Sequence, residues 1–208
     1  PNHRHSRCWP EAFRQAVHFF ANAVENISST QWDEPALGVW TVRDLVGHTR
    51  LSFARVAEFS QQRANKIDVE SAAQHYHVSL SVEGINDAIA ERGRVAGQGL
   101  GDDVTTMLRA SIEATLAVLK TTPDNAVIAY PNGGIKLEHY LETRVLELVV
   151  HTVDILVATG IEIEPPRQAL SCTLHLLADL AVDSGIGSQL ALLVTGRRVI
   201  HDRFSVLG

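Results

Sequence analysis

A glutamate and a histidine stand one helical turn apart in the most apolar long segment of the chain. Glu147 and His151 occupy positions i and i+4 within residues 137–159, so on a helix both side chains project from one face. A carboxylate and an imidazole placed in this way can reach the same metal ion at about 2.0–2.2 Å. The simpler alternative is an ion pair on a solvent-exposed face. A metal site therefore requires a third ligand from another part of the chain.

His48 is the residue best placed to be that third ligand. It belongs to a second amphipathic segment, residues 42–62, and shares a helical edge with Asp44, Ser52 and Arg55. Helix bundles build metal sites from inward-facing side chains of neighbouring helices. Two histidines and one glutamate leave the fourth tetrahedral position open, as in catalytic zinc sites. The alternative for His48 is a core or boundary histidine that donates to a carbonyl group.

The elements that must position these residues are mainly helical. Apolar residues recur at helical spacing in four long segments, so we expect an all-α fold built on a four-helix bundle. The four segments are residues 11–27, 42–62, 104–120 and 137–159. We assign the bundle to residues 1–164 and a helical or strand extension, packed on the bundle, to residues 165–208.

The segments between the long helices give weaker signals. Residues 63–103 read as the most loop-rich part, with short helical patterns at 72–78 and 82–94 that end at Gly97, Gly99 and Gly101. Residues 126–130 fit a short strand, and residues 190–194 fit either a strand or a helix. The apolar residues of 167–182 and 190–194 need a partner, so we expect the extension to pack near the metal cleft.

The second long helix has a sharp start signal. Thr41 and Asp44 have the spacing of a capping box, in which each side chain accepts from the backbone of the other residue. Trp40 and Leu45 occupy the two positions of a hydrophobic staple around that cap. The sequence therefore predicts that the backbone entering this helix is well defined, two turns before His48.

Composition restricts the classes of function. The chain has 208 residues, 45 % of them hydrophobic, and its formal net charge of −6 argues against binding to duplex nucleic acid. No apolar run approaches the ~20 residues that cross a bilayer, and no signal-peptide core follows Pro1. Two cysteines, Cys8 and Cys172, form no disulfide framework. We therefore expect a cytoplasmic protein, without membrane or nucleic-acid partners, that is a monomer or a homodimer.

Two motifs resemble one known family. Residues 40–48, WTVRDLVGH, resemble the GWTVRDLVAHL element of the mycothiol-dependent maleylpyruvate isomerase N-terminal family. That family belongs to the DinB-like four-helix metalloprotein superfamily. Residues 143–154, TRVLELVVHTVD, are similar to its second element, TR-x-x-E-x-x-x-H-x-x-D. The order and spacing of the two motifs also fit, and the resemblance covers residues 10–160.

The resemblance implies a metal-dependent enzyme of an actinobacterial cytoplasm. His48, Glu147 and His151 fall on the family's metal ligands, the ion is usually zinc, and its open position receives the thiolate of a small thiol, mycothiol. The two-domain isomerases carry a larger C-terminal domain than residues 166–208 would make. Residues 190–198 are similar instead to the LLLALTGR tail of short members. Isomerisation of maleylpyruvate itself is therefore not implied.

We expect an isomerase or S-transferase that adds the thiol to a small electrophilic substrate. Arg144 and Asp154 are the candidate catalytic residues: both are placed to orient the metal ligands, and Arg144 is equally suited to a substrate carboxylate. Trp40, Ser52 and Arg55 are the candidate contacts for the thiol. The alternatives are a non-catalytic metal-binding bundle of a stress response and a metal-dependent hydrolase.

The remaining candidates carry weaker signals. Arg197 and Arg198 are either cations for an acidic substrate or solvated surface residues. Several histidines have no partner at ligand spacing and are interpreted as structural or solvated: His18, His75, His77, His175 and His201.

Overall fold

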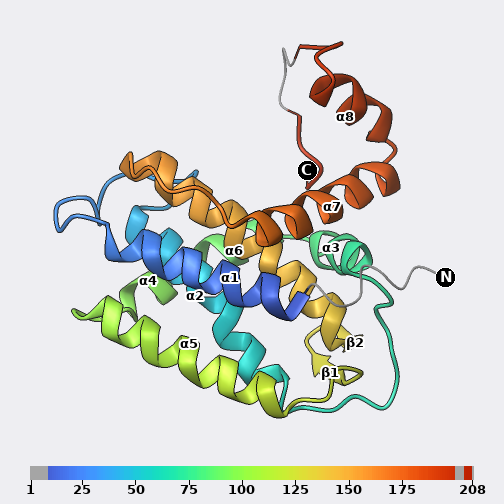
Figure 1. Ribbon diagram of the computed structural model, residues 1–208, viewed down its shortest axis with the longest axis horizontal. Coiled ribbons are helices and arrows are strands. Elements are labelled where there is room, and N and C mark those ends of the chain that lie inside the picture. Colours follow the sequence, from blue (N-terminus) through green and yellow to red (C-terminus); the bar gives the residue numbers. More distant parts are fainter. Residues whose placement is uncertain (1–8, 200–203, 208) are drawn as a thin grey trace.

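The computed structural model describes residues 9–199 and 204–207, so Cys8 and His201 lie outside the described residues. Four long helices form the body of the molecule (Figure 1), and the all-α class predicted from the sequence is confirmed. These helices are α1 (Trp9–Glu25), α2 (Val42–Phe59), α5 (Val104–Thr121) and α6 (Leu137–Thr159). Helix α6 packs against α1 and α2, and α5 packs against the same two helices. No helix among the described residues is long and apolar enough to cross a membrane.

The core lies between these helices and is rich in aromatic side chains. Phe13 and Phe20 of α1 and Phe53 of α2 are fully buried, and the rings of Phe20 and Phe53 lie 6.1 Å apart. Helix α6 is buried on most of its circumference, in agreement with its apolar sequence. A polar side chain on this helix is therefore enclosed unless it faces a cavity.

The capping box predicted at the start of α2 is confirmed. The Thr41 hydroxyl accepts from the Asp44 backbone N–H at 3.2 Å, and the Asp44 carboxylate accepts from the Thr41 N–H at 3.1 Å. Trp40 and Leu45 are both buried in the same hydrophobic core. The start of α2 is thereby fixed by local interactions and by the core together.

Residues 63–103 are more helical than the sequence suggested. The short helical patterns predicted at 72–78 and 82–94 are confirmed as α3 (Ala72–Leu80) and α4 (Ile85–Gln98), whereas the expectation that the segment is loop-rich is wrong. The reason is tertiary packing of α4 on α2. Gly93 and Gly97 lie inside α4, where a β-carbon would collide with the Trp40 ring and with Asp44. A β-carbon on Gly47 of α2 would likewise collide with the Gly97 backbone. These glycines permit the close approach of α2 and α4, and Gly97 resembles a helix terminator only when the sequence is considered alone.

A short antiparallel hairpin precedes α6. Strand β1 (Val127–Tyr130) confirms the predicted strand, and it pairs with β2 (Gly133–Lys136). The first residues of β2 were expected to form a turn. Gly133 has a φ of +106°, a conformation that favours glycine. The hairpin leads directly into α6 and places Tyr130 beside Tyr140, with ring centroids 5.6 Å apart.

The C-terminal residues form two further helices, α7 (Arg167–Asp183) and α8 (Gly187–Val194), so residues 190–194 are helical. Helix α7 packs against α1, α3 and α6 and buries Ala169, Leu176 and Leu180. Helix α8 packs against α7, buries none of its residues and projects from the end of the molecule (Figure 1).

The close approach of α2 and α4 generates a prediction. Replacing Gly47 with alanine should lower the free energy of unfolding by about 1–3 kcal/mol, because the new methyl group has no room against the Gly97 backbone. Chemical denaturation followed by circular dichroism measures this change. Gly99→Ala is the matched control, since its β-carbon would make ordinary contacts at 3.5 Å, and its effect should stay within about 1 kcal/mol. Equal stability of the two variants would contradict the packing argument.

Candidate metal centre

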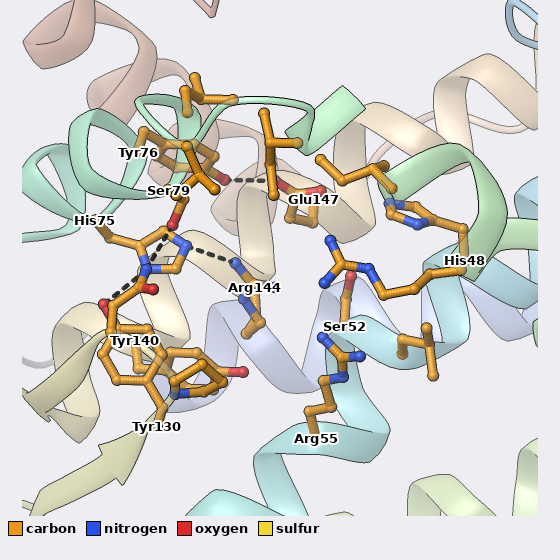
Figure 2. Close-up of a pocket in the computed structure, with 18 of the residues that line it drawn as sticks. His48, Ser52, Arg55, His75, Tyr76, Ser79, Tyr130, Tyr140, Arg144 and Glu147 are labelled. Carbon is orange, nitrogen blue, oxygen red and sulfur yellow. Dashed lines mark hydrogen bonds between the residues drawn. The ribbon is translucent and has the colours of Figure 1, made fainter. Parts of the chain in front are cut away.

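The three predicted metal ligands meet in the structure. His48 comes from α2, and Glu147 and His151 come from α6; one ligand atom of each residue lies within 4.8 Å of the other two. Glu147 Oε2 is 3.3 Å from His151 Nε2, and the rings of His48 and His151 are 5.1 Å apart in an edge-to-face arrangement. Figure 2 shows Glu147 and His48 projecting from different elements into the same pocket. All three side chains are partly buried.

Trp40 holds His48 in place. The indole ring is tilted by 32° against the His48 ring with centroids 4.6 Å apart, and its Nε1–H donates to the carbonyl of Ala90 in α4 at 2.9 Å. Trp40 is only 7 % exposed. The sequence analysis assigned Trp40 to thiol binding; the structure places it in the pocket lining, with its only polar group already used by Ala90.

Two residues anchor the ligands of α6. His151 Nδ1 lies 3.1 Å from Asp154 Oδ2, the carboxylate–histidine pairing that commonly orients metal-binding histidines. The Tyr76 hydroxyl lies 2.8 Å from Glu147 Oε1 and donates to it. Asp154 was a candidate for orienting a ligand, and its position fits that role. Tyr76 was missed, because nothing local in residues 63–103 connects α3 to α6.

The electrostatics of the site separate the two histidines. Burial and the positive charge of His151 lower the pKa of His48 to about 4, so its imidazole is neutral. Burial would also lower the pKa of His151, but hydrogen bonds to Asp154 and Glu147 outweigh it and raise that pKa to about 9. Burial would raise the pKa of Glu147, yet hydrogen bonding and the charge of His151 hold it well below its usual range. Glu147 is therefore a carboxylate, and His151 carries a proton that a bound cation would displace.

The donor set fits a divalent metal ion. Two imidazole nitrogens and one carboxylate oxygen are ligands that zinc accepts. His48 Nδ1 is buried and has no hydrogen-bond partner among the described residues. A neutral imidazole with an unsatisfied buried nitrogen, next to a carboxylate, is suited to bind a cation.

A cavity of about 380 Å³ lies beside the three ligands. Of the other predicted site residues, Ser52, Arg55 and Arg144 line this cavity and Asp154 does not. Arg92, Tyr130 and Tyr140 also line it and were not predicted from the sequence. His75, interpreted as structural or solvated, is buried in the wall of the cavity and lies 3.2 Å from Arg144.

The C-terminal extension does not contribute to this cavity. No described residue after His151 lines it, but Leu176 and Leu180 of α7 share a hydrophobic cluster with Tyr76 of its wall, so the extension packs behind the cavity and does not enter it. The apolar face of α7 is used instead against α1, α3 and α6. Arg197 and Arg198 are exposed beyond α8, away from the three ligands.

Comparison with known proteins identifies a family. The family model described as mycothiol maleylpyruvate isomerase N-terminal domain matches residues 13–156, a range that includes all three candidate ligands and ends near the C-terminus of α6. No curated protein and no solved structure is significantly similar to the chain.

Metal content tests the three-ligand site. Wild-type protein loaded with zinc and freed of excess ion should retain about one ion per chain, measured by elemental mass spectrometry. His151→Ala should lose most of this ion, since it removes one of three protein ligands. His139→Ala removes a partly exposed histidine of the same helix that contacts Glu138 and Glu142, and it should retain the ion. Full occupancy in His151→Ala would refute the site.

The buried His75 predicts a pH dependence of stability. Burial and the nearby Arg144 lower the pKa of folded His75 to about 3, whereas an unfolded histidine titrates near ~6.5. Because the unfolded chain binds the proton first, stability falls as the pH drops below ~6.5. Between pH 7 and pH 5, the free energy of unfolding of the metal-free wild type should fall by about 2 kcal/mol more than that of His75→Gln. Urea denaturation at each pH measures this difference. Parallel pH profiles would show that this histidine titrates normally.

Proposed function

The chain belongs to the mycothiol maleylpyruvate isomerase N-terminal domain family, and from this premise we propose that it is a metal-dependent enzyme that uses a small thiol, mycothiol. The reaction is an isomerisation or an S-transfer on a small electrophile, in an actinobacterial cytoplasm. The observation that carries the proposal is the convergence of His48, Glu147 and His151 beside a cavity of about 380 Å³. The proposed ion is zinc, since the ligand types suit it.

When bound, such an ion lowers the pKa of a thiol, which is otherwise near ~8.5, and makes the thiolate available at neutral pH. The chain's own residues prepare the ligands. Asp154 Oδ2 holds a proton on His151 Nδ1 and leaves Nε2, the nitrogen nearer Glu147, as the donor atom. Tyr76 occupies Glu147 Oε1, so Oε2 is the oxygen beside His151 Nε2. Three protein ligands leave a position for an exogenous group.

The cavity next to this open position is lined by polar groups that suit a thiol and its substrate. Ser52 and Arg55 of α2 are the proposed contacts for the thiol, together with the indole face of Trp40. Arg144 of α6 lies between Tyr130 of the hairpin and the candidate metal ligand His48 in the pocket. It is the proposed cation that would bind an anionic group of the substrate. The electrophile would then be held within reach of the thiolate, which lowers the entropic part of the barrier.

Linked stabilisation tests the use of a thiol. Zinc-loaded protein should be stabilised further by mycothiol, by about 2.7 kcal/mol at a hundredfold excess over Kd, in thermal unfolding. S-methyl mycothiol is the matched ligand control, since it lacks an ionisable thiol and should give no added stabilisation. Metal-free protein and His151→Ala should not respond to mycothiol. If zinc stabilises the protein and mycothiol adds nothing, the thiol proposal fails and a metal-binding bundle or a hydrolase replaces it.

A further inference from the structure

The cavity beside the metal ligands is strongly biased toward positive charge. Arg55, Arg92 and Arg144 line it, whereas Glu147, already a candidate metal ligand, is its only carboxylate among the described residues. None of the three arginines forms a salt bridge to a carboxylate in the described part of the chain. The whole chain has a net charge of −6. An excess of unpaired guanidinium groups in one cavity of an acidic protein indicates an anionic ligand.

Arg144 is the most rigidly held of the three. Its Nε–H donates to Thr143 Oγ1 at 3.0 Å, and its Nη2 lies 3.2 Å from His75 Nε2. Its guanidinium carbon is 5.1 Å from the centre of the Tyr140 ring. A guanidinium has five N–H donors, so most of them remain for a ligand. The orientation of the group is fixed before any ligand arrives.

His75 determines that orientation. A guanidinium only donates, so His75 Nε2 accepts from Arg144, and the hydrogen of the neutral ring is on Nδ1. Nδ1 lies 3.2 Å from the Tyr130 hydroxyl and donates to its oxygen. The ring is 8 % exposed and stacks on Tyr130 with centroids 5.5 Å apart. His75 therefore acts as a fixed, neutral acceptor behind Arg144.

Tyr140 supplies a second donor beside Arg144. Its side chain is 2 % exposed and lines the cavity, and no described residue forms a hydrogen bond with its hydroxyl. Figure 2 shows Tyr140 and His75 on one side of the pocket and His48 on the other, with Arg144 between them. A hydroxyl that lines a cavity and has no protein partner is available to donate to a ligand.

We propose that Tyr140 and Arg144 form a subsite for an anionic oxygen group of the ligand, distinct from the metal ligands, and that His75 is its positioning residue. A planar oxyanion such as a carboxylate matches a guanidinium edge and an adjacent O–H donor. Assigning this group to the substrate of the thiol reaction rests on the proposed function. The binding of an anion at Tyr140 and Arg144 does not.

Calorimetry on metal-free protein separates the two proposals. Benzoate and benzamide have the same shape and differ in charge, and both are small enough for a cavity of about 380 Å³. With a chelator present, benzoate should bind at least about tenfold more tightly than benzamide, since it pairs with Arg144. Equal affinities would overturn the subsite. Benzoate binding without any response to mycothiol would keep the subsite and remove the thiol chemistry.

Variants assign the binding to individual residues. Tyr140→Phe keeps the buried ring and removes the hydroxyl. It should therefore lower the affinity for benzoate about tenfold and leave the affinity for benzamide unchanged. Arg144→Gln should abolish the preference for benzoate. Arg109→Gln removes an arginine that pairs with Glu25 outside the cavity, and it should bind benzoate as wild type does. Wild-type affinity in Tyr140→Phe would refute the role of its hydroxyl.

The positioning role of His75 has its own comparison. His75→Gln retains a side-chain acceptor for Arg144 and should keep benzoate affinity within about twofold, whereas His75→Leu removes the acceptor and should lower affinity about tenfold. Both variants should fold, as judged by their helical circular dichroism. Equal affinities in the two variants would show that the ring only fills space.

Discussion

The relative register of α2 and α6 is the constraint on which the site depends. Glu147 and His151 are brought together by the helix that carries both, but His48 reaches them only if α2 lies against α6 at one rotation and one height. The capping box at Thr41 fixes where α2 begins, and Trp40 packs its ring on His48. Helix α4 in turn fixes Trp40 through the Ala90 carbonyl and presses on α2 at Gly47. The site is thus the product of one helix–helix contact that three separate features stabilise.

The site also has to tolerate buried charge. Glu147 is a carboxylate enclosed by the bundle, and it is satisfied by Tyr76 on one oxygen and His151 on the other. Asp154 supports the protonated His151 from behind. This arrangement lets the same residues hold either a proton or a metal ion, because each ligand already has a fixed second partner. His48 is the exception, with a buried nitrogen that has no partner in the described part of the chain, and it is the ligand that gains most from a cation.

Local signals made part of this structure predictable from sequence. The capping box depends on two residues three positions apart, and the Glu147–His151 pair on one helical turn, so both could be inferred before the fold. Tyr76 and His75 could not, since they reach the site through packing of α3 on α6. Gly97 was interpreted as the end of a helix, because the sequence alone does not distinguish a glycine that allows close helix packing from one that ends a helix. The exact contacts of the extension could not be predicted, because the apolar face of α7 shows that a partner exists without showing which one.

A single stripe of α6 connects the two halves of the pocket. Tyr140, Arg144, Glu147, His151 and Asp154 follow one another at steps of four and three residues, so all five lie along one face of the helix. The stripe was partly visible in the sequence, but its first member was not, because a tyrosine in an apolar helix looks like core. Arg144 and His151 are separated by seven residues, which is about 10 Å along a helix axis. A rigid helix therefore sets the spacing between Arg144 and the two candidate metal ligands of α6, so any ligand that contacts both must match a distance fixed by the helix and not by a loop.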